Sequence, residues 1–433
     1  MTAPVVAGSA PPSGQDEPHR TKPRHSPRRL QFVRTFAALQ YPNYRRWFWG
    51  QMISLFGTWM QATAQGFLIY ELTKSPGYLG IVGFANGIPA WIFMLYAGVV
   101  ADRMSRRRLM IITQSCMMVQ AFILAALTFL HVVQPWHIVL LSFGLGTANA
   151  FDAPARLSLV TELVDREHLT NAIAMNATMF NVATAVGPGA AGIAYAALGP
   201  AWCFTLNGIS FIGVIIALAS MEMAPFVRRI SKESPMKELG EGIRYAVNHP
   251  IIRALLFLTA STTLLGTSLM TLFPAWAVDI LHGDASTNGW LQSLRGIGAL
   301  IAALTIASLG HLNFRGKILT VGTIAYPVFM MLFSVVRTTP LALLILVFIG
   351  GSFIFVFNLT NATIQTNVDD KLRGRVMAVY SLVFFGFMPV GALMVGGVAQ
   401  TIGPPLTVFL CGAGALLFAG GLWKFSPKLR EQP

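Results

Sequence analysis

Long apolar runs separated by short polar stretches fill the chain from residue 47 to residue 424. A bilayer core is about 30 Å thick, so a helix needs roughly 20 apolar residues to cross it. Runs of this length predict membrane-spanning helices, and the runs lack the alternation typical of strands. The predicted spans are twelve, at approximately 47–70, 77–101, 108–130, 136–154, 171–198, 201–221, 251–278, 287–309, 317–336, 340–365, 375–401 and 404–424.

The polar stretches carry nearly all of the positive charge. The chain has 31 Lys and Arg against 17 Asp and Glu, a formal net charge of +14 at pH 7. If both termini are cytoplasmic, only Lys74 and Arg337 lie outside and only Arg295 lies within a span. Cytoplasmic loops collect Lys and Arg, so this placement predicts a multi-pass protein of the cell (inner or plasma) membrane with both termini cytoplasmic. The basic side then faces anionic membrane lipids, and no nucleic acid is expected as a partner.

Composition argues against an ordinary soluble enzyme. Only 11% of the residues are charged, whereas a soluble domain has about 25%. The three cysteines lie in separate apolar runs without metal-ligand spacing, so no metal site is expected. No nucleotide-binding loop or other cofactor motif is present, which excludes ATP-driven transport by this chain alone. We therefore expect a membrane protein that is not an enzyme and binds no cofactor.

The chain divides into two similar halves. We expect a disordered basic tail over 1–46, a six-helix bundle over 47–221, a linker with an amphipathic helix over 222–250, a second bundle over 251–425 and a tail over 426–433. Three short matches recur at one constant spacing: Val164-Asp165 with Val368-Asp369, Gly187 and Gly192 with Gly391 and Gly396, and Leu198-Gly199-Pro200 with Ile402-Gly403-Pro404. Two parallel repeats of six helices are one plan of secondary transporters. The predicted fold class is an all-α membrane protein with twelve transmembrane helices in two pseudo-symmetric six-helix bundles.

One polar loop carries a family motif. The segment Gly98-Val-Val-Ala-Asp102-Arg103-Met-Ser-Arg106-Arg107 resembles the loop between spans two and three of the major facilitator superfamily, with Ser105 at a position where Gly is usual. Further segments resemble its bacterial enterobactin-exporter and macrolide-efflux branch. They are Phe151-Asp152-Ala-Pro-Ala-Arg156, Gly187-Pro188, and Leu372-Arg373-Gly-Arg375-Val-Met377. The resemblance covers residues 47–424.

The resemblance implies a set of gating residues. These are Gly98, Asp102, Arg103, Arg106, Arg107, Asp152, Arg156, Gly187, Pro188, Arg373 and Arg375. A carboxylate such as Asp102 can pair with a nearby Arg or face a helix N-terminus, and such contacts can hold the two halves in one state. The alternative is that the arginines only follow the positive-inside rule. In span five, Pro removes a backbone donor and Gly allows close approach, which also fits ordinary helix packing.

Polar residues along two spans suggest a substrate cavity. Gln51, Ser54, Thr58, Gln61 and Gln65 step by three or four and share one helix face. Because polar groups are costly in lipid, this face should meet the bundle interior or water. Asn358 and Asn361 form a shorter stripe, and Trp59 could supply an apolar wall. The same stripes could instead make hydrogen bonds between helices.

Arg295 is the only cation expected within a span. A guanidinium in the membrane is costly and marks function by default, and its planar fork suits carboxylates and other oxyanions. We therefore consider it an anchor for an anionic substrate group. It could also extend to the outer surface, or pair with Asp279 or Asp284.

The resemblance implies a secondary active transporter, acting as a monomer, that exports an amphipathic small molecule such as a drug, siderophore or secondary metabolite. Coupling to protons is implied by the family alone, because the sequence places Asp102 and Asp152 at inner span ends and no acid at the membrane midplane. The alternatives are a lipid flippase or uptake carrier of the same fold, and a receptor or assembly factor that transports nothing.

Overall fold

The structure is a computed structural model that describes residue 2 and residues 36–223, 235–308 and 315–425. Residues 1 and 3–35 of the expected tail 1–46, residues 224–234 of the linker 222–250 and the tail 426–433 lie outside the described residues. Every element in the described part is helical. The elements are η1 (Ala37–Gln40), α2 (Pro42–Thr73), α3 (Pro76–Arg103), α4 (Arg106–Phe129), α5 (Pro135–Leu163), α6 (Leu169–Leu198), α7 (Pro200–Ala219), α8 (Pro235–Asn248), α9 (Pro250–Ser261), η2 (Thr262–Gly266), η3 (Thr267–Leu272), α10 (Phe273–Ala275), η4 (Trp276–Ile280), α11 (Ala285–Ser308), α12 (Arg315–Val335), α13 (Thr339–Asn367), α14 (Arg373–Ile402) and α15 (Pro404–Phe425).

Proline and glycine set many helix boundaries. Pro is the first residue of seven helices, where its missing N–H costs nothing and its fixed φ suits the first turn: α2, α3, α5, α7, α8, α9 and α15. Gly199 and Gly403 end α6 and α14 with φ of 86° and 82°, a backbone region that a side chain disfavours. Their N–H groups donate to the carbonyls of Tyr195 and Ala399. The two matched positions of the sequence repeat therefore adopt the same backbone geometry.

Nine helical stretches in the described residues are long and apolar enough to cross a membrane: α4, α5, α7, α9 through η4, α11, α12, α13, α14 and α15. Helices α2, α3 and α6 are not among them, although their 32, 28 and 30 residues would reach about 42–48 Å. Large apolar side chains such as Leu130 (70% exposed), Val321 (66%) and Leu417 (77%) point outward, as expected for a surface that contacts lipid. These features define a multi-pass membrane protein.

The seventh predicted span, 251–278, lies within a stretch that is long and apolar enough to cross a membrane, but this stretch is not one regular helix. It begins as α9, passes through a π-helical turn (η2) and a 3₁₀ segment (η3), and ends in the π-helical turn η4. Irregular turns inside helices accompany inserted side chains or close packing. The close packing here is at Gly266, where an added methyl group would lie 2.6 Å from the Tyr326 hydroxyl.

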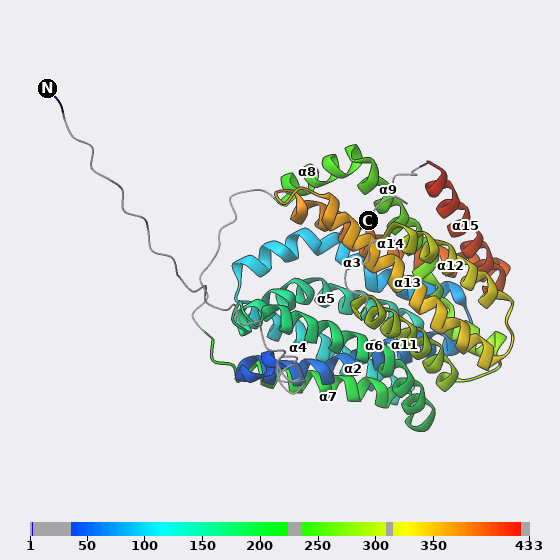
Figure 1. The fold of residues 1–433 in the computed structure, drawn as a ribbon. Coiled ribbons are helices and arrows are strands. Elements are labelled where there is room, and N and C mark those ends of the chain that lie inside the picture. Colours follow the sequence, from blue (N-terminus) through cyan, green and yellow to red (C-terminus); the bar gives the residue numbers. More distant parts are fainter. Residues whose placement is uncertain (1, 3–35, 224–234, 309–314, 426–433) are drawn as a thin grey trace, which may run out of the picture.

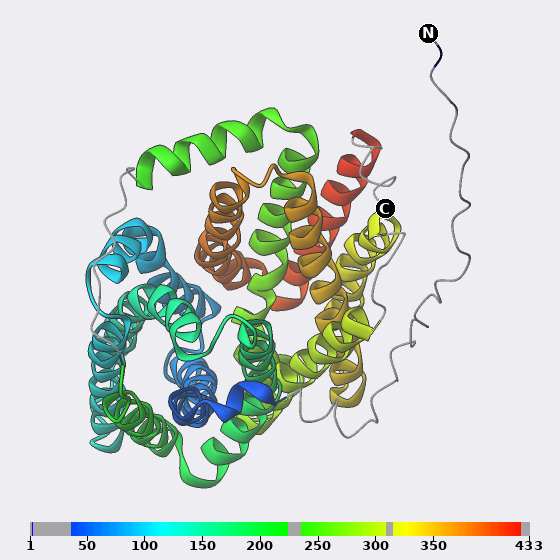
Figure 2. The same ribbon diagram turned by 60° about the vertical axis from the view of Figure 1, so that its left-hand side comes forward.

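The helices before and after residue 230 form two groups. In Figure 2 the blue to dark-green helices α2 to α7 gather at the lower left, and the bright-green to red helices from α8 onward lie above them and to the right. We call residues 36–223 the N-terminal half and residues 235–425 the C-terminal half. Helix α3 packs on α14, and α6 packs on α11, so these two pairs join the halves. Helix α8, the amphipathic helix expected near Met236–Val247, lies across the end of the C-terminal half against α14.

Small residues let the joining helices approach closely. A methyl group on Gly80 would come within 2.7 Å of the Ala392 carbonyl oxygen, and one on Gly192 within 2.6 Å of the Ala285 carbonyl oxygen. Only glycine fits such backbone contacts, as in other membrane helix pairs. These contacts lie near the start of α3 and the end of α6. The interface is therefore tight at the end of the bundle away from Arg103, Arg106 and Arg373.

Hydrogen bonds reinforce the same end. We call the end that carries Arg103, Arg106 and Arg373 the basic end, and the other the far end. At the far end the Tyr70 hydroxyl donates to Asp279, and the Ser75 hydroxyl donates to Gln400 at 2.6 Å. Three further pairs cross between the halves nearby: Gly189 N to Ser293 Oγ, Ser286 Oγ to Gly192 O, and Thr63 Oγ1 to Gln292 Oε1. The far end of the interface is closed in this structure.

Candidate substrate and gating sites

Two glutamines of the polar stripe in α2 are bound inside the N-terminal half. The side chain of Gln61 donates to Gln120 of α4 at 2.9 Å and accepts from Asn207 of α7 at 2.7 Å. Gln65 donates to the Ser142 hydroxyl of α5 at 2.6 Å. The hydrogen-bonded side chains are all buried: Gln61, Gln65, Gln120, Ser142 and Asn207. Bonding to one another inside the bundle reduces the cost of placing polar groups in a membrane protein. At Gln61 and Gln65 the structure thus has the hydrogen bonds between helices that were the alternative to cavity lining.

The rest of the stripe lies closer to the basic end. Gln51 and Ser54 are buried, and Gln51 Oε1 has no hydrogen-bond partner in the described residues. The Thr58 hydroxyl donates to the Ser54 carbonyl at 2.8 Å. Trp59 packs its ring against Phe180 and lies beside Gly187 of α6, where a methyl group would meet Trp59 Cβ at 2.8 Å. Trp59 thereby joins α2 to α6.

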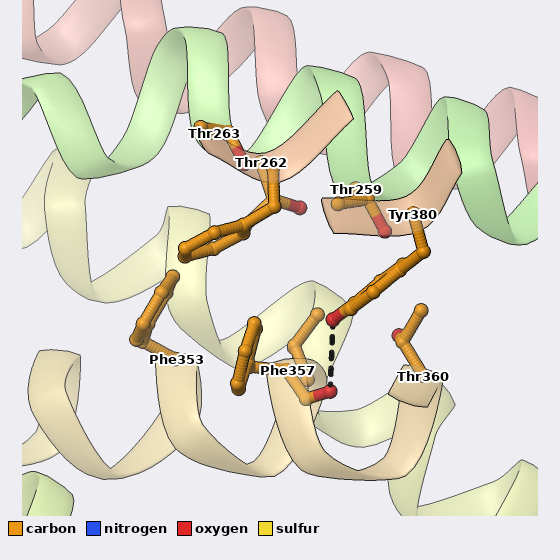
Figure 3. Close-up of a pocket in the computed structure, with 9 residues that line it drawn as sticks. Thr259, Thr262, Thr263, Phe353, Phe357, Thr360 and Tyr380 are labelled. Atoms are coloured by element: carbon orange, nitrogen blue, oxygen red, sulfur yellow. Dashed lines mark hydrogen bonds between the residues drawn. The ribbon is translucent and has the colours of Figure 1, made fainter. Parts of the chain in front are cut away.

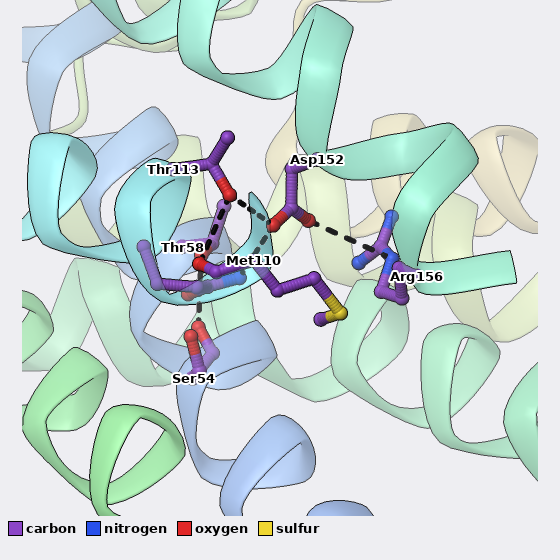
Figure 4. A network of polar contacts seen from close by, with 7 residues as sticks. Ser54, Thr58, Met110, Thr113, Asp152 and Arg156 are labelled. Carbon is purple, nitrogen blue, oxygen red and sulfur yellow. Dashed lines mark hydrogen bonds and ion pairs between the residues drawn. The ribbon is translucent and has the colours of Figure 1, made fainter. Parts of the chain in front are cut away.

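Asp152 is a buried carboxylate, only 2% exposed, held by three side chains (Figure 4). Its Oδ1 accepts from Thr113 at 2.8 Å and from Gln114 at 3.0 Å, both on α4. Arg156, one turn later on α5, brings Nε to 3.9 Å from the other oxygen. These contacts tie the carboxylate of Asp152 to α4 and to the next turn of its own helix.

The helix that carries Asp152 extends beyond the predicted span 136–154. The apolar run ends near residue 154, which placed Asp152 at a span end, but α5 continues to Leu163. Asp152 therefore lies about 26 Å from the first residue of α5 and about 17 Å from the last. The helix is longer than the apolar run because residues beyond the lipid can be polar and still remain helical. Asp152 is inside the bundle, near the middle of its helix.

The basic-end arginines make contacts within their own halves. Arg106 forms an ion pair with Glu162 of α5, and Arg107 donates to the Ala219 carbonyl of α7 at 2.5 Å. Arg373 pairs with Asp370 at 2.5 Å, and Arg375 forms an ion pair with Glu241 of α8. Arg103 is exposed at the end of α3. These contacts fix the ends of α4 and α14 and the position of α8.

The loop motif also contains Gly98 and Asp102. Gly98 has open space around it, since an added methyl group would meet no atom within 4 Å. The side chain of Asp102 lies outside the described part of the chain.

In α6, Gly187 and Pro188 are buried, and Pro188 O lies beside Gly289 of α11. Gly187 and Pro188 therefore sit at the contact between the halves.

Arg295 lines a pocket of about 230 Å³ in the C-terminal half, together with Gly266, Leu269, Met270, Tyr326, Ile349 and Phe353. Its Nε is buried and has no hydrogen-bond partner, and no acidic residue in the described ranges lies within ion-pair distance. The two acids considered as partners are otherwise engaged. Asp279 accepts from Tyr70, and Asp284 caps α11 by accepting from Thr287 N at 3.0 Å.

Asn358 and Asn361 are half-buried on α13, and Asn361 accepts from Gln365 at 2.6 Å. A second pocket, which the sequence analysis missed, adjoins this helix (Figure 3). It encloses about 210 Å³ and is lined by Thr259, Thr262, Thr263, Phe353, Val356, Phe357, Thr360, Tyr380 and Phe384. Phe353, Phe357 and Thr360 are spaced by four and three residues, so the sequence alone places them on one face of a helix. What the sequence could not show is that α9 and α14 bring threonines and further rings to that face.

Metal chemistry finds no support in the described residues, where no group of three or more His, Cys, Asp and Glu side chains could hold an ion. The two pockets offer binding groups: apolar rings, hydroxyls and one guanidinium.

Comparison with known proteins places the chain in a family. The family described as transmembrane secretion effector matches residues 33–433. The staphyloferrin A transporter of Staphylococcus aureus is 24% identical over 89% of this chain and 97% of its own length, and the multidrug efflux pump Tap of Mycolicibacterium fortuitum is 25% identical over 87% and 93%. The enterobactin exporter EntS of Shigella flexneri is 24% identical over 87% and 90%.

The fold agrees with these relatives. The solved structure of the nucleoside transporter NupG superposes with a TM-score of 0.70, at 14% identity, over 88% of this chain and 98% of that one. Fold and relatives together define a transporter of the major facilitator superfamily and not an enzyme. Within that superfamily, the chain belongs to the transmembrane secretion effector family. The resemblance drawn from the loop motifs is thus confirmed.

Proposed function

We propose that this protein is a secondary active exporter that moves an amphipathic small molecule (a drug, siderophore or secondary metabolite) across the cell membrane by alternating access. The observation that carries the proposal is Arg295, whose buried Nε has no hydrogen-bond partner among the described residues, in a pocket beside the α6–α11 contact. An unpaired guanidinium inside a membrane bundle is costly unless a ligand uses it. Export is favoured over uptake by the family description and by the exporter and efflux-pump relatives.

The architecture we propose has six spans in each half, twelve in all, as two bundles over 47–221 and 251–425 joined by the linker 222–250. The basic end faces the cytoplasm with both termini and the tails 1–46 and 426–433, because Lys and Arg collect on that side. The shared geometry of Gly199 and Gly403 supports the two-fold repeat. The protein would act as a monomer, with its basic end against anionic lipids.

In the transport cycle, the closed far end corresponds to a state that is shut toward the outside. The opposite state would be held at the basic end by the motif residues Gly98, Asp102, Arg103, Arg106, Arg107, Arg373 and Arg375, with Gly187 and Pro188 at the pivoting contact. Asp102→Ala is expected to abolish transport while leaving the protein inserted. Unchanged transport in vesicles would argue against this role for Asp102.

Proton coupling, which we include in the proposal, needs a carboxylate that can change protonation as the halves move. Asp152 is the candidate, because it is buried inside α5 and Arg156 lies within one turn. The substrate would contact Arg295, with Asn358, Asn361, Gln51, Ser54, Thr58 and Trp59 along the path and Gln61 and Gln65 as its structural support.

The experiment is an export and resistance screen in a host that lacks its own pumps, repeated with a proton uncoupler. The proposal expects wild-type protein to lower intracellular accumulation of at least one amphipathic compound, and the uncoupler to remove the effect. Arg295→Ala should weaken export of anionic compounds at least tenfold more than neutral ones, and Arg295→Lys should restore part of it. Accumulation that rises with expression would instead indicate an uptake carrier.

A further inference from the structure

The pocket between α9, α13 and α14 is built mainly of rings and hydroxyls (Figure 3). The space of about 210 Å³ between these side chains is partly open to solvent, so it is a recess and not a sealed cavity.

The rings of the pocket come from two helices. Phe357 of α13 and Phe384 of α14 lie 4.7 Å apart between ring centroids, inclined by 52°. Phe353, one turn before Phe357, is nearly parallel to it at 6.1 Å and lies 6.4 Å from Phe384. Aromatic pairs prefer such offset and inclined arrangements, and a further planar ring can join them by the same contacts.

The pocket also contains hydroxyl groups, of which two are important here. The Thr360 hydroxyl is buried, the residue being 1% exposed, and its Oγ1 has no hydrogen-bond partner in the described residues. The Tyr380 hydroxyl donates to the Phe357 carbonyl at 3.4 Å and also interacts with the Asn361 side chain. Buried polar groups are nearly always hydrogen-bonded, so Thr360 points to a partner that the protein itself does not supply.

Phe353 lines both this pocket and the pocket of Arg295. It is the middle residue of the 29-residue helix α13, so it lies about 21 Å from either helix end. Arg295 lies nearer the far end, about 15 Å from the start of α11, whereas Tyr380 is about 10 Å from the basic end of α14. The two pockets thus follow one another along the bundle and meet at its centre.

From these observations we infer that the two pockets are one bipartite site for molecules that combine an aromatic ring with an acidic group. The ring sits among Phe353, Phe357 and Phe384, a ring hydroxyl bonds to Thr360, and the anion bonds to Arg295. No acidic side chain lines either pocket, so cationic compounds gain nothing there. The inference rests on the proposed export function and names its substrate class.

The test compares two acids that differ only in aromaticity, 2-naphthoate and its saturated analogue decahydro-2-naphthoate. Their binding to the full-length protein in lipid nanodiscs is measured by titration calorimetry. Wild-type protein should prefer the aromatic acid. Phe357→Leu and Phe384→Leu should each weaken 2-naphthoate about tenfold and leave the saturated acid within twofold, because ring contacts are lost but apolar volume is mostly kept. Arg295→Gln should weaken both acids alike.

Phe348→Leu is the matched control, since Phe348 is on the same helix but 49% exposed and stacked on Phe329 outside the pocket. Thr360→Val should weaken 6-hydroxy-2-naphthoate but not 2-naphthoate, with the exposed Thr366→Val as its control. Retained binding of the saturated acid shows that each variant is folded. No binding of 2-naphthoate to wild-type protein, or a preference that survives both Phe variants, would overturn the inference. The export screen decides the proposed function separately, because it depends on neither probe.

Discussion

The hydroxyl of Tyr70, near the end of α2, donates a hydrogen bond to the carboxylate of Asp279 in the opposite half of the chain. Tyr70 is buried and Asp279 is exposed, so the bond lies at the rim of the closed far end. One residue later, Glu71 accepts from Tyr195 at 2.5 Å, but this pair stays within the N-terminal half. The Tyr70 bond must therefore break when the far end opens, whereas the Glu71 bond can remain.

Tyr70→Phe removes the bond between the halves with little change in volume. A hydrogen bond to a charged group contributes about 1.5–3 kcal/mol, so the population open at the far end should rise by roughly tenfold or more. Distances between spin labels on α3 and α14 would report that population. Tyr195→Phe is the control and should leave the distances unchanged; an equal shift in both variants would show that the Tyr70 bond has no special role.

Gly396→Ala should hinder closure of the far end, because its methyl group would lie 2.7 Å from both Gly80 Cα and the Pro76 carbonyl oxygen. The neighbouring Gly397 has no atom within 4 Å of an added methyl group. Gly397→Ala is therefore expected to transport normally, whereas Gly396→Ala should lose most activity at normal membrane expression. Equal activity of the two variants in vesicle transport would contradict the packing argument.

Asp152→Asn keeps an acceptor for Thr113 and Gln114 but removes the charge. If Asp152 carries the coupled proton, transport by the variant should no longer respond to an imposed pH gradient, while substrate exchange without a gradient continues. Vesicle flux with and without the gradient measures this. Glu167→Gln changes an exposed acid of the following loop and should leave coupling intact. Gradient-driven transport by Asp152→Asn would rule Asp152 out.

Asn207→Ala tests whether Gln61 is structural. The change leaves Gln61 Oε1 buried without its donor, which should lower stability by about 1–3 kcal/mol without altering which substrates are exported. Thermal unfolding in detergent measures the stability, and the export profile serves as the second readout. A changed profile at unchanged stability would favour the cavity-lining interpretation of the α2 stripe.

The sequence by itself determined the order of the helices, several of their ends, and the family. Apolar runs and opening prolines act within a few residues, so the ends of α3, α7 and α15 fall within two residues of the expected spans. The repeat at Gly199 and Gly403 was likewise visible, because a positive φ is a local demand that glycine meets.

Tertiary structure decided which polar groups meet. The spacing of Gln61 and Gln65 shows that they share one face of α2. Only the packing of the helices decides that this face forms hydrogen bonds with α4, α5 and α7. The irregular turns beyond α9, the burial of Asp152 and the ring pocket around Phe357 follow from the same cause. Hydropathy depends on neighbours in the chain, whereas a binding site depends on how helices distant in sequence are rotated against one another.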